Sequence, residues 1–132
     1  MTDTVRRASG SCRAMVRGLR ERLRELGDRH GDRINVRAGE HWIAVRSSRH
    51  GRVFAELRPS RNGLVVFILP RPGLLRDPRN LARAAPRTQG WGWFRTRFDV
   101  RSPDDVGAAF RLIRQSYIYG SRNPNGRHGH RP

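Results

Sequence analysis

The chain has 132 residues, 36% of them hydrophobic, which suits one compact domain with a modest core and polar ends. It carries 28 Lys and Arg residues against 11 Asp and Glu, so its net charge is 28 − 11 = +17, and all 28 are arginine. The absence of lysine excludes a Walker A loop and the usual restriction-nuclease core, and the single Cys12 excludes an intramolecular disulfide and a cysteine-based zinc site.

The arginine excess indicates a polyanionic partner. A GC-rich genome would explain arginine in place of lysine, but it would not explain why carboxylates are so few. Nucleic acid, DNA or RNA, is the partner that such a charge most often serves, and an acidic protein is the alternative. A membrane partner is not expected, because no apolar segment reaches membrane-spanning length.

Residues 1–11 form a polar leader rich in Ser, Thr and Arg. The leader contains no apolar run, so it does not resemble a signal peptide, and a cytoplasmic location is expected. From Cys12 onward, a helical stripe is formed by Met15 or Val16, Leu19, Leu23 and Leu26. Gly27 is expected to cap this helix at its C-terminus, and the arginines on its other side are interpreted as a solvated face.

The segment from Ile34 to Leu69 predicts four strands joined by tight hairpins. Turns are expected at Gly39, His50-Gly51 and Asn62-Gly63, where glycine supplies a positive φ. The predicted strands are Ile34 to Arg37, Trp42 to Arg46, Arg52 to Arg58, and Leu64 to Leu69. The last is apolar on both faces, which predicts a central strand covered on one side by helices and on the other by a loop or a partner.

Residues 70–90 are rich in Pro and Arg, and Asp77 followed by Pro78 predicts a short helix from Asp77 to Ala84. A fifth strand follows, because Phe94, Thr96, Phe98 and Val100 alternate with charged residues.

The last helix starts at Ser102, where a serine N-cap, Pro103 and two aspartates complement the helix dipole. Its apolar stripe ends at Tyr117. Residues 120–132 lack apolar periodicity and predict a disordered basic tail.

These patterns together predict an α+β fold. It consists of an antiparallel sheet of about five strands, with an N-terminal and a C-terminal helix packed on one of its faces. The single domain is expected to span residues 12–119.

Three motifs in the second half of the chain carry a resemblance to a known family. They are the turn DPRNLAR at 77–83, the pair Trp91-Gly92 and the helix end LIRQSY at 112–117. They resemble the family called domain of unknown function 5655, over roughly Ile34 to Tyr119. Such members read His-Trp-Gly-Asn-Gly where this chain reads GWGWF at 90–94. The resemblance implies a small domain found alone or attached to restriction-nuclease-like proteins, and so an association with a nuclease or defence system.

No residue pattern predicts catalysis, a metal site or a cofactor. Glu56-Leu57-Arg58 imitates half of a nuclease motif, but arginine does not readily release a proton. Ser47 and Ser48 lie near His50, but no orienting carboxylate is close in sequence. His128 and His130 are interpreted as an incidental pair. An enzyme is therefore not expected, and a degenerate, lysine-free nuclease is the remaining enzymatic alternative.

Arginines interleaved with aromatic residues instead predict a nucleic-acid surface. On the fifth strand Trp93, Arg95, Arg97 and Arg101 share one phase, so they are expected to project from one surface, unless Trp93 packs against the Pro-rich loop or a helix. Further arginines flank the hairpins at His50 and Asn62. The full candidate set is Arg46, Arg52, Arg58, Arg61, Trp93, Arg95, Arg97 and Arg101.

The function expected from this set is a non-enzymatic binding module that contacts the phosphate backbone of DNA or RNA with little sequence preference. The alternative is a protein-interaction or oligomerisation domain for an acidic partner.

Overall fold

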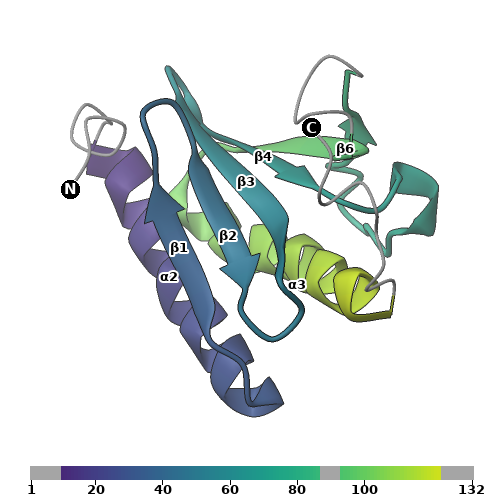
Figure 1. Ribbon diagram of the computed structural model, residues 1–132. Coiled ribbons are helices and arrows are strands. Elements are labelled where there is room, and N and C mark those ends of the chain that lie inside the picture. The colour runs from purple at the N-terminus through teal and green to yellow at the C-terminus, as the bar shows by residue number, and fades with distance from the viewer. Residues whose placement is uncertain (1–9, 87–92, 123–132) are drawn as a thin grey trace.

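Two helices and one antiparallel sheet make up the part of the chain that the computed structural model describes, residues 10–86 and 93–122 (Figure 1). The helices are α2 (Gly10–His30) and α3 (Val106–Arg122), with short 3₁₀ turns at Pro72–Leu74 and Pro103–Asp105. The strands are β1 (Ile34–Ala38), β2 (Ile43–Ser47), β3 (Arg52–Ser60), β4 (Gly63–Ile68), β5 (Arg83–Ala84) and β6 (Thr96–Val100). The predicted α+β fold is confirmed, with two-residue β5 as a sixth strand.

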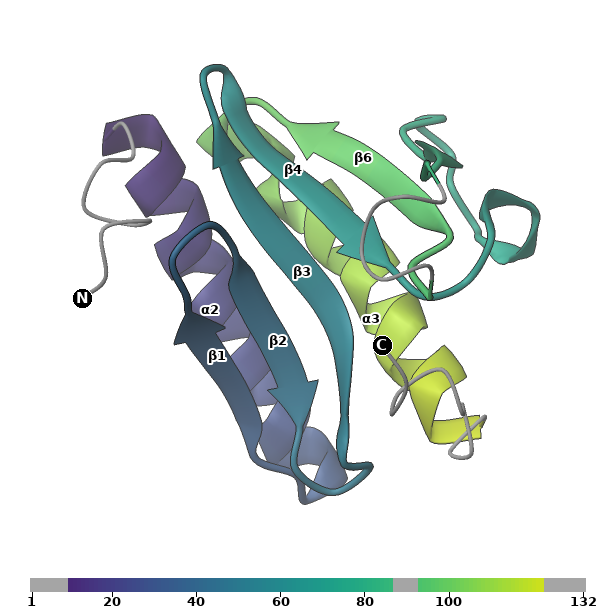
Figure 2. The ribbon, with the colours of Figure 1, turned by 45° about the horizontal axis from the view of Figure 1, so that its top comes forward.

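The strands pair antiparallel throughout, in the order β1-β2-β3-β4-β6-β5. Both helices lie behind the sheet in Figure 1, and the turned view of Figure 2 shows the same two layers. β4 is flanked by β3 and β6, as its apolar sequence predicts. The sheet therefore has one face covered by helices and one opposite face.

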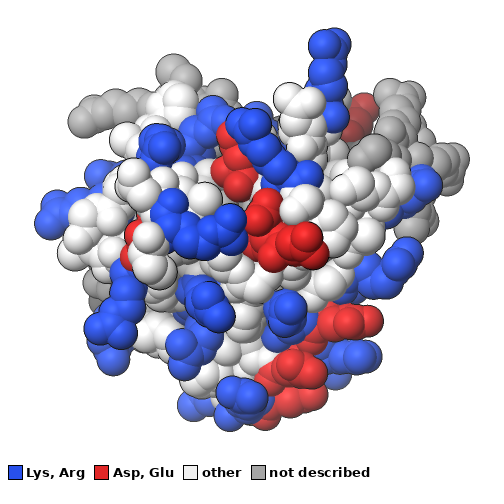
Figure 3. Space-filling view, turned by 180° about the vertical axis from the view of Figure 1, so that it is seen from behind, with Lys and Arg blue, Asp and Glu red and all other residues white. Residues whose placement is uncertain are grey.

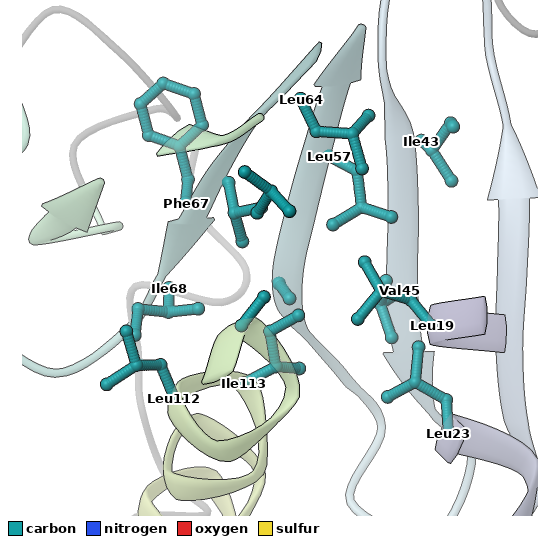
Figure 4. Close-up of a cluster of buried hydrophobic side chains, with 14 of the residues drawn as sticks. Leu19, Leu23, Ile43, Val45, Leu57, Leu64, Phe67, Ile68, Leu112 and Ile113 are labelled. Carbon is teal, nitrogen blue, oxygen red and sulfur yellow. The ribbon is translucent and has the colours of Figure 1, made fainter. Parts of the chain in front are cut away.

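The main core lies between the helices and the sheet. Leu19 and Leu23 of α2, and Leu112 and Ile113 of α3, meet alternate residues of the strands such as Val45, as Figure 4 shows. All of these side chains are at most 2% exposed, and burial of each one contributes on the order of 2 kcal/mol. The helices approach each other where Gly18, which lacks a side chain, leaves room for Val106.

The C-terminus of α2 differs from its prediction. Gly27 is not the cap, because the helix continues to His30 and ends at Gly31, whose φ is 61°. The Asp32 N–H bonds the Gly27 carbonyl at 2.8 Å, and the Gly31 N–H bonds the Asp28 carbonyl, which is a Schellman motif. Gly27 instead lets the chain fold back, because a Cβ there would lie 2.6 Å from the Asp32 carbonyl oxygen.

The hairpin turns follow the predictions with one exception. Gly51 and Gly63 adopt positive φ values of 67° and 140°. Gly39 does not have a positive φ, and its turn is closed by a hydrogen bond of 2.8 Å from its N–H to the Trp42 carbonyl.

The short helix expected from Asp77 to Ala84 is absent. Residues 77–80 form a turn closed by the Asn80 N–H and the Asp77 carbonyl at 3.0 Å, and the Asp77 carboxylate accepts the N–H groups of Leu81 and Ala82. Asp77 does cap backbone groups, but Asn80 has a φ of 52°, which ends any helix. The chain then enters β5, and Arg83 pairs with Arg97 of β6.

The last helix begins as predicted, with a different role for Ser102. Its hydroxyl donates to the Asp105 carboxylate at 3.3 Å and makes no cap to a backbone N–H. A 3₁₀ turn at Pro103–Asp105 leads into α3, which extends to Arg122. The rest of the predicted tail, residues 123–132, and of the leader, residues 1–9, lies outside the described residues, as do Trp91 and Gly92.

Candidate nucleic-acid interface

The sheet face opposite the helices, called the open face below, gathers arginines from across the sheet. Residues paired across antiparallel strands project from the same face. One row of paired residues crosses the whole sheet, and it runs Arg37, Ala44, Glu56, Phe67, Arg97 and Arg83. Arg46 of β2 and Arg58 of β3 lie on the same face, in phase with Ala44 and Glu56. The open face thus receives an arginine from β1, β2, β3, β5 and β6.

Strand β6 has the phase that the sequence predicts. Arg95 and Arg101 are exposed and Arg97 is partly exposed, whereas Phe94, Thr96, Phe98 and Val100 between them are buried. Asp99 lies between two of these arginines, and its carboxylate oxygens are 3.4 Å from Arg97 Nη2 and 3.4 Å from Arg101 Nη2. Exposed pairs of this kind are weak, and one carboxylate serves two guanidinium groups. The strand therefore keeps a net positive charge on this face.

Arg37, Arg46 and Arg61 are also exposed. Arg37 and Arg46 project from β1 and β2, and Arg61 lies in the turn between β3 and β4. Within residues 10–86 and 93–122, none of these three forms an ion pair with a carboxylate, so their charges are available to a ligand.

Arg58 also belongs to the open face, but its side chain is less exposed than those of Arg37 and Arg46. Its Cζ is 5.3 Å from the ring centroids of both Trp42 and Phe67, and its Nη2 is 3.5 Å from Glu56 Oε1. Glu56 is only 4% exposed, and burial raises the pKa of its carboxyl group, although Arg58 opposes this rise. Arg58 therefore stacks on aromatic rings and pairs with a buried acid, and it offers a ligand only part of its side chain.

Arg52 is separated from the other candidates. It is 6% exposed, pairs in register with the buried Ser47, and lies close to Gly120 of α3. Burial lowers the pKa of its guanidinium group. The structure therefore places Arg52 on the helix side of the sheet.

Trp93 is half-buried. It packs against the core, with its ring centroid 6.3 Å from that of Phe94. Phe94 in turn lies 6.4 Å from Phe67 of the open face. Most of the Trp93 side chain is therefore packed against other residues, as the alternative interpretation expects, and only part of it is exposed.

Arginines are not confined to the open face. Figure 3, seen from the side of the helices, shows basic side chains over much of the surface with acidic groups between them. The arginines of α2 lie among three acidic residues, Glu21, Glu25 and Asp28. The open face differs because its two strand carboxylates, Glu56 and Asp99, are already engaged by arginine.

Sequence reasoning missed two arginines of the open face, Arg37 and Arg83. Arg37 was in phase within a predicted strand, so its position could have been inferred. Arg83 could not, because its segment was predicted as helix and lies in β5, where its Nη1 donates to the Asn80 and Ala82 carbonyls.

A polar cluster joins Ser47 to a carboxylate that is distant in sequence. Ser47 Oγ donates to Asp32 Oδ2 at 2.5 Å, and Tyr117 Oη donates to the same oxygen at 2.9 Å. The His50 N–H donates to Ser47 Oγ at 3.0 Å. Ser47 is fully buried and bonds the carboxylate directly, without a histidine between them, so this cluster is structural and not a nucleophile with its base.

Within the described residues, no group of three or more His, Cys, Asp or Glu side chains could hold a metal ion. The described helices also include none with the length and apolar character required to cross a membrane. Comparisons with protein-family models, curated proteins and solved structures return no match. The resemblance to the family called domain of unknown function 5655 therefore stays a prediction.

Proposed function

We propose that this chain is a non-enzymatic binding module that contacts the phosphate backbone of DNA or RNA through its open face, with little sequence preference. The observation that carries the proposal is the balance of charge on this face. Arg37, Arg46 and Arg95 are exposed without a carboxylate partner in the described residues, while Glu56 is buried and Asp99 is shared. Such a surface attracts polyanions and gains affinity from release of counterions.

The fold favours contacts to phosphates over reading of bases. The two helices are separated in sequence by all six strands, so they do not form the helix-turn-helix unit that presents a recognition helix to the major groove. The aromatic residues nearest the open face are partly covered, Trp42 by Arg58 and Trp93 by its packing, which limits base stacking. Guanidinium groups remain as the principal contacts.

The test is fluorescence anisotropy of the full chain with labelled duplex DNA, single-stranded DNA and RNA, at several salt concentrations and with heparin as competitor. Arg95→Gln with Arg97→Gln removes two charges from the open face. Arg22→Gln with Arg29→Gln, two exposed positions of α2, is the matched control. Loss of two phosphate contacts should reduce the slope of log K against log salt by almost 2, whereas the control should leave it nearly unchanged.

Equal effects of both pairs would mean that the attraction is generic, and would overturn the assignment to the open face. Binding that disappears at near-physiological salt, or that heparin matches fully, would overturn nucleic acid as the partner. A nuclease would reveal itself separately by cleavage of the same labelled strands on addition of Mg²⁺.

The second candidate is a docking or oligomerisation domain for an acidic protein, associated with a nuclease or defence system. The observation that favours this candidate is that β1 is an edge strand of five residues. Its Arg37 projects from the open face. Edge strands have unpaired backbone groups that can receive a further strand. This candidate predicts a partner retained at moderate salt, when nucleic acid no longer binds.

A further inference from the structure

A cleft of about 410 Å³ lies between the turn at residues 76–81 and the outer side of α3. None of its lining residues belongs to a strand, so it is separate from the open face. This volume lies within the usual range for small-molecule pockets, about 300–1,000 Å³. The cleft unites two of the distinctive sequence segments, DPRNLAR and LIRQSY, which are about 30 residues apart.

Four arginines line this cleft: Arg76, Arg79, Arg111 and Arg114. Arg79 Nη2 is engaged with Asp105 Oδ1 at 3.1 Å. The other three are exposed, and none forms an ion pair with a carboxylate in residues 10–86 and 93–122. They therefore leave a concentrated positive charge at the cleft.

The lining contains a single carboxylate, that of Asp77, and both of its oxygens already accept hydrogen bonds. Its two oxygens accept the backbone N–H groups of Leu81 at 3.0 Å and Ala82 at 2.8 Å. Asp77 thus shapes the turn from within, and its single charge offsets only part of the charge of the three arginines.

The cleft is held in shape before any ligand arrives. Gln115 of α3 accepts the Arg76 N–H at 2.8 Å and donates to the Arg76 carbonyl at 2.9 Å, so both ends of its amide bind one residue of the turn. A preformed site loses less entropy when a ligand binds. The remaining wall is apolar and includes Pro78, Leu81, Ala108 and the buried Leu112.

From this arrangement we propose that the cleft binds a small phosphate monoester with a flat apolar part, of the size and chemistry of a nucleoside monophosphate. A phosphate monoester carries almost two negative charges at neutral pH and three acceptor oxygens. Three arginines without carboxylate partners match a phosphate monoester better than they match a carboxylate, because the monoester offers almost two charges and three acceptor oxygens, whereas a carboxylate offers one charge and two oxygens. The base packs on the apolar wall.

Isothermal titration calorimetry of the full chain with adenosine monophosphate tests the proposal, with inorganic phosphate and adenosine as the two fragments. The expected result is saturable 1:1 binding of the nucleotide, at least tenfold tighter than either fragment. Arg111→Gln with Arg114→Gln should weaken this binding at least tenfold, since charged hydrogen bonds of this kind are each worth about a factor of ten. The control pair, Arg22→Gln with Arg29→Gln, should change it less than about twofold.

Thermal unfolding checks that both double variants are folded, which is expected because the substituted side chains are exposed. No detectable binding of nucleotide or phosphate at millimolar concentration would overturn the proposal. So would equal weakening by both pairs, or adenosine binding as tightly as its monophosphate.

The test of the cleft can fail or succeed independently of the DNA-binding test of the open face. The Arg111 and Arg114 variant should bind labelled DNA within about twofold of the original chain. If it loses DNA and nucleotide affinity equally, the cleft is a part of the polymer surface and the small-ligand assignment is wrong.

Discussion

Tyr117 donates its phenolic hydrogen bond to Asp32 over 2.9 Å and so ties α3 to the loop that follows α2. The same carboxylate accepts Ser47 Oγ and, at 2.8 Å, the Arg49 backbone N–H. Burial by itself raises the pKa of Asp32, but these hydrogen bonds outweigh burial and hold the pKa below its usual value. One carboxylate therefore connects both helices to the hairpin between β2 and β3.

Tyr117→Phe should lower the free energy of unfolding by about 1–2 kcal/mol at neutral pH. The ring remains in the core, but Asp32 loses a donor in a partly buried site. Urea denaturation of both proteins measures the change. Unchanged stability of Tyr117→Phe would contradict a stabilising role for this hydrogen bond.

Tyr117 should also titrate late in alkali. Burial, followed by the hydrogen bond to Asp32, raises its pKa to about 12. Since the folded pKa lies above the unfolded value of about 10, this contribution to stability is complete below pH ~10 and is lost as pH rises towards 12. The chain has two tyrosines, so absorbance titration should show one late phase that Tyr117→Phe removes. Ionisation of Tyr117 near its ordinary pKa in the folded protein would refute this.

Asp32→Asn should flatten the acid limb of the stability curve. The pKa of Asp32 is lowered in the folded state, so its contribution is present above the unfolded pKa of about 3.9 and is lost as pH falls through the folded pKa. The variant should be less stable by about 1–3 kcal/mol at pH 7, and the difference should narrow at low pH. Urea denaturation between pH 7 and pH 2 provides both values, and a difference independent of pH would contradict the assignment.

Glu56→Gln should have the opposite dependence on pH. Burial raises the pKa of Glu56, so folding favours its protonated form, and the original chain loses stability relative to the variant as pH rises through the unfolded pKa of about 4.3 to the folded value. The comparison uses unfolding free energies of both proteins from pH 4 to pH 7. Parallel curves would show that Arg58 fully offsets the burial of the carboxylate.

Gly27→Ala and Gly107→Ala should change stability in opposite directions, although both positions lie within helices. Alanine is intrinsically better in a helix by about 1 kcal/mol. At Gly107 nothing lies within 4 Å of the added Cβ, so that variant should be stabilised by about 0.5–1 kcal/mol. At Gly27 the Cβ meets the Asp32 carbonyl oxygen at 2.6 Å, so that variant should be destabilised. Thermal unfolding measures both, and stabilisation at Gly27 would contradict the close approach.

Local patterns predicted the elements of this fold well. Alternation along β6 and the helical stripes of α2 and α3 follow from the geometry of strand and helix, which a sequence carries directly. The errors occurred where two nearby residues favour different local structures, so that the sequence alone does not show which of them sets the end or the start of a helix. Gly27 has the chemistry of a cap, but Gly31 ends the helix, and Asp77-Pro78 has the chemistry of a helix start, but Asn80 turns the chain into β5.

Composition and periodicity are enough to establish the charge, the α+β class and the phase that places Arg95, Arg97 and Arg101 on one side of β6. Which arginines a ligand can reach depends instead on how the helices and strands pack together. Arg52 and Arg61 look alike beside their hairpins, but α3 packs against the first and leaves the second exposed. The packing of the whole chain also places Asp32 within hydrogen-bonding distance of Ser47, and Arg76 and Arg111 in one cleft. These residues are too far apart in sequence for a local pattern to connect them. The physical reason is that burial and convergence depend on which elements pack together, and packing is a property of the whole chain.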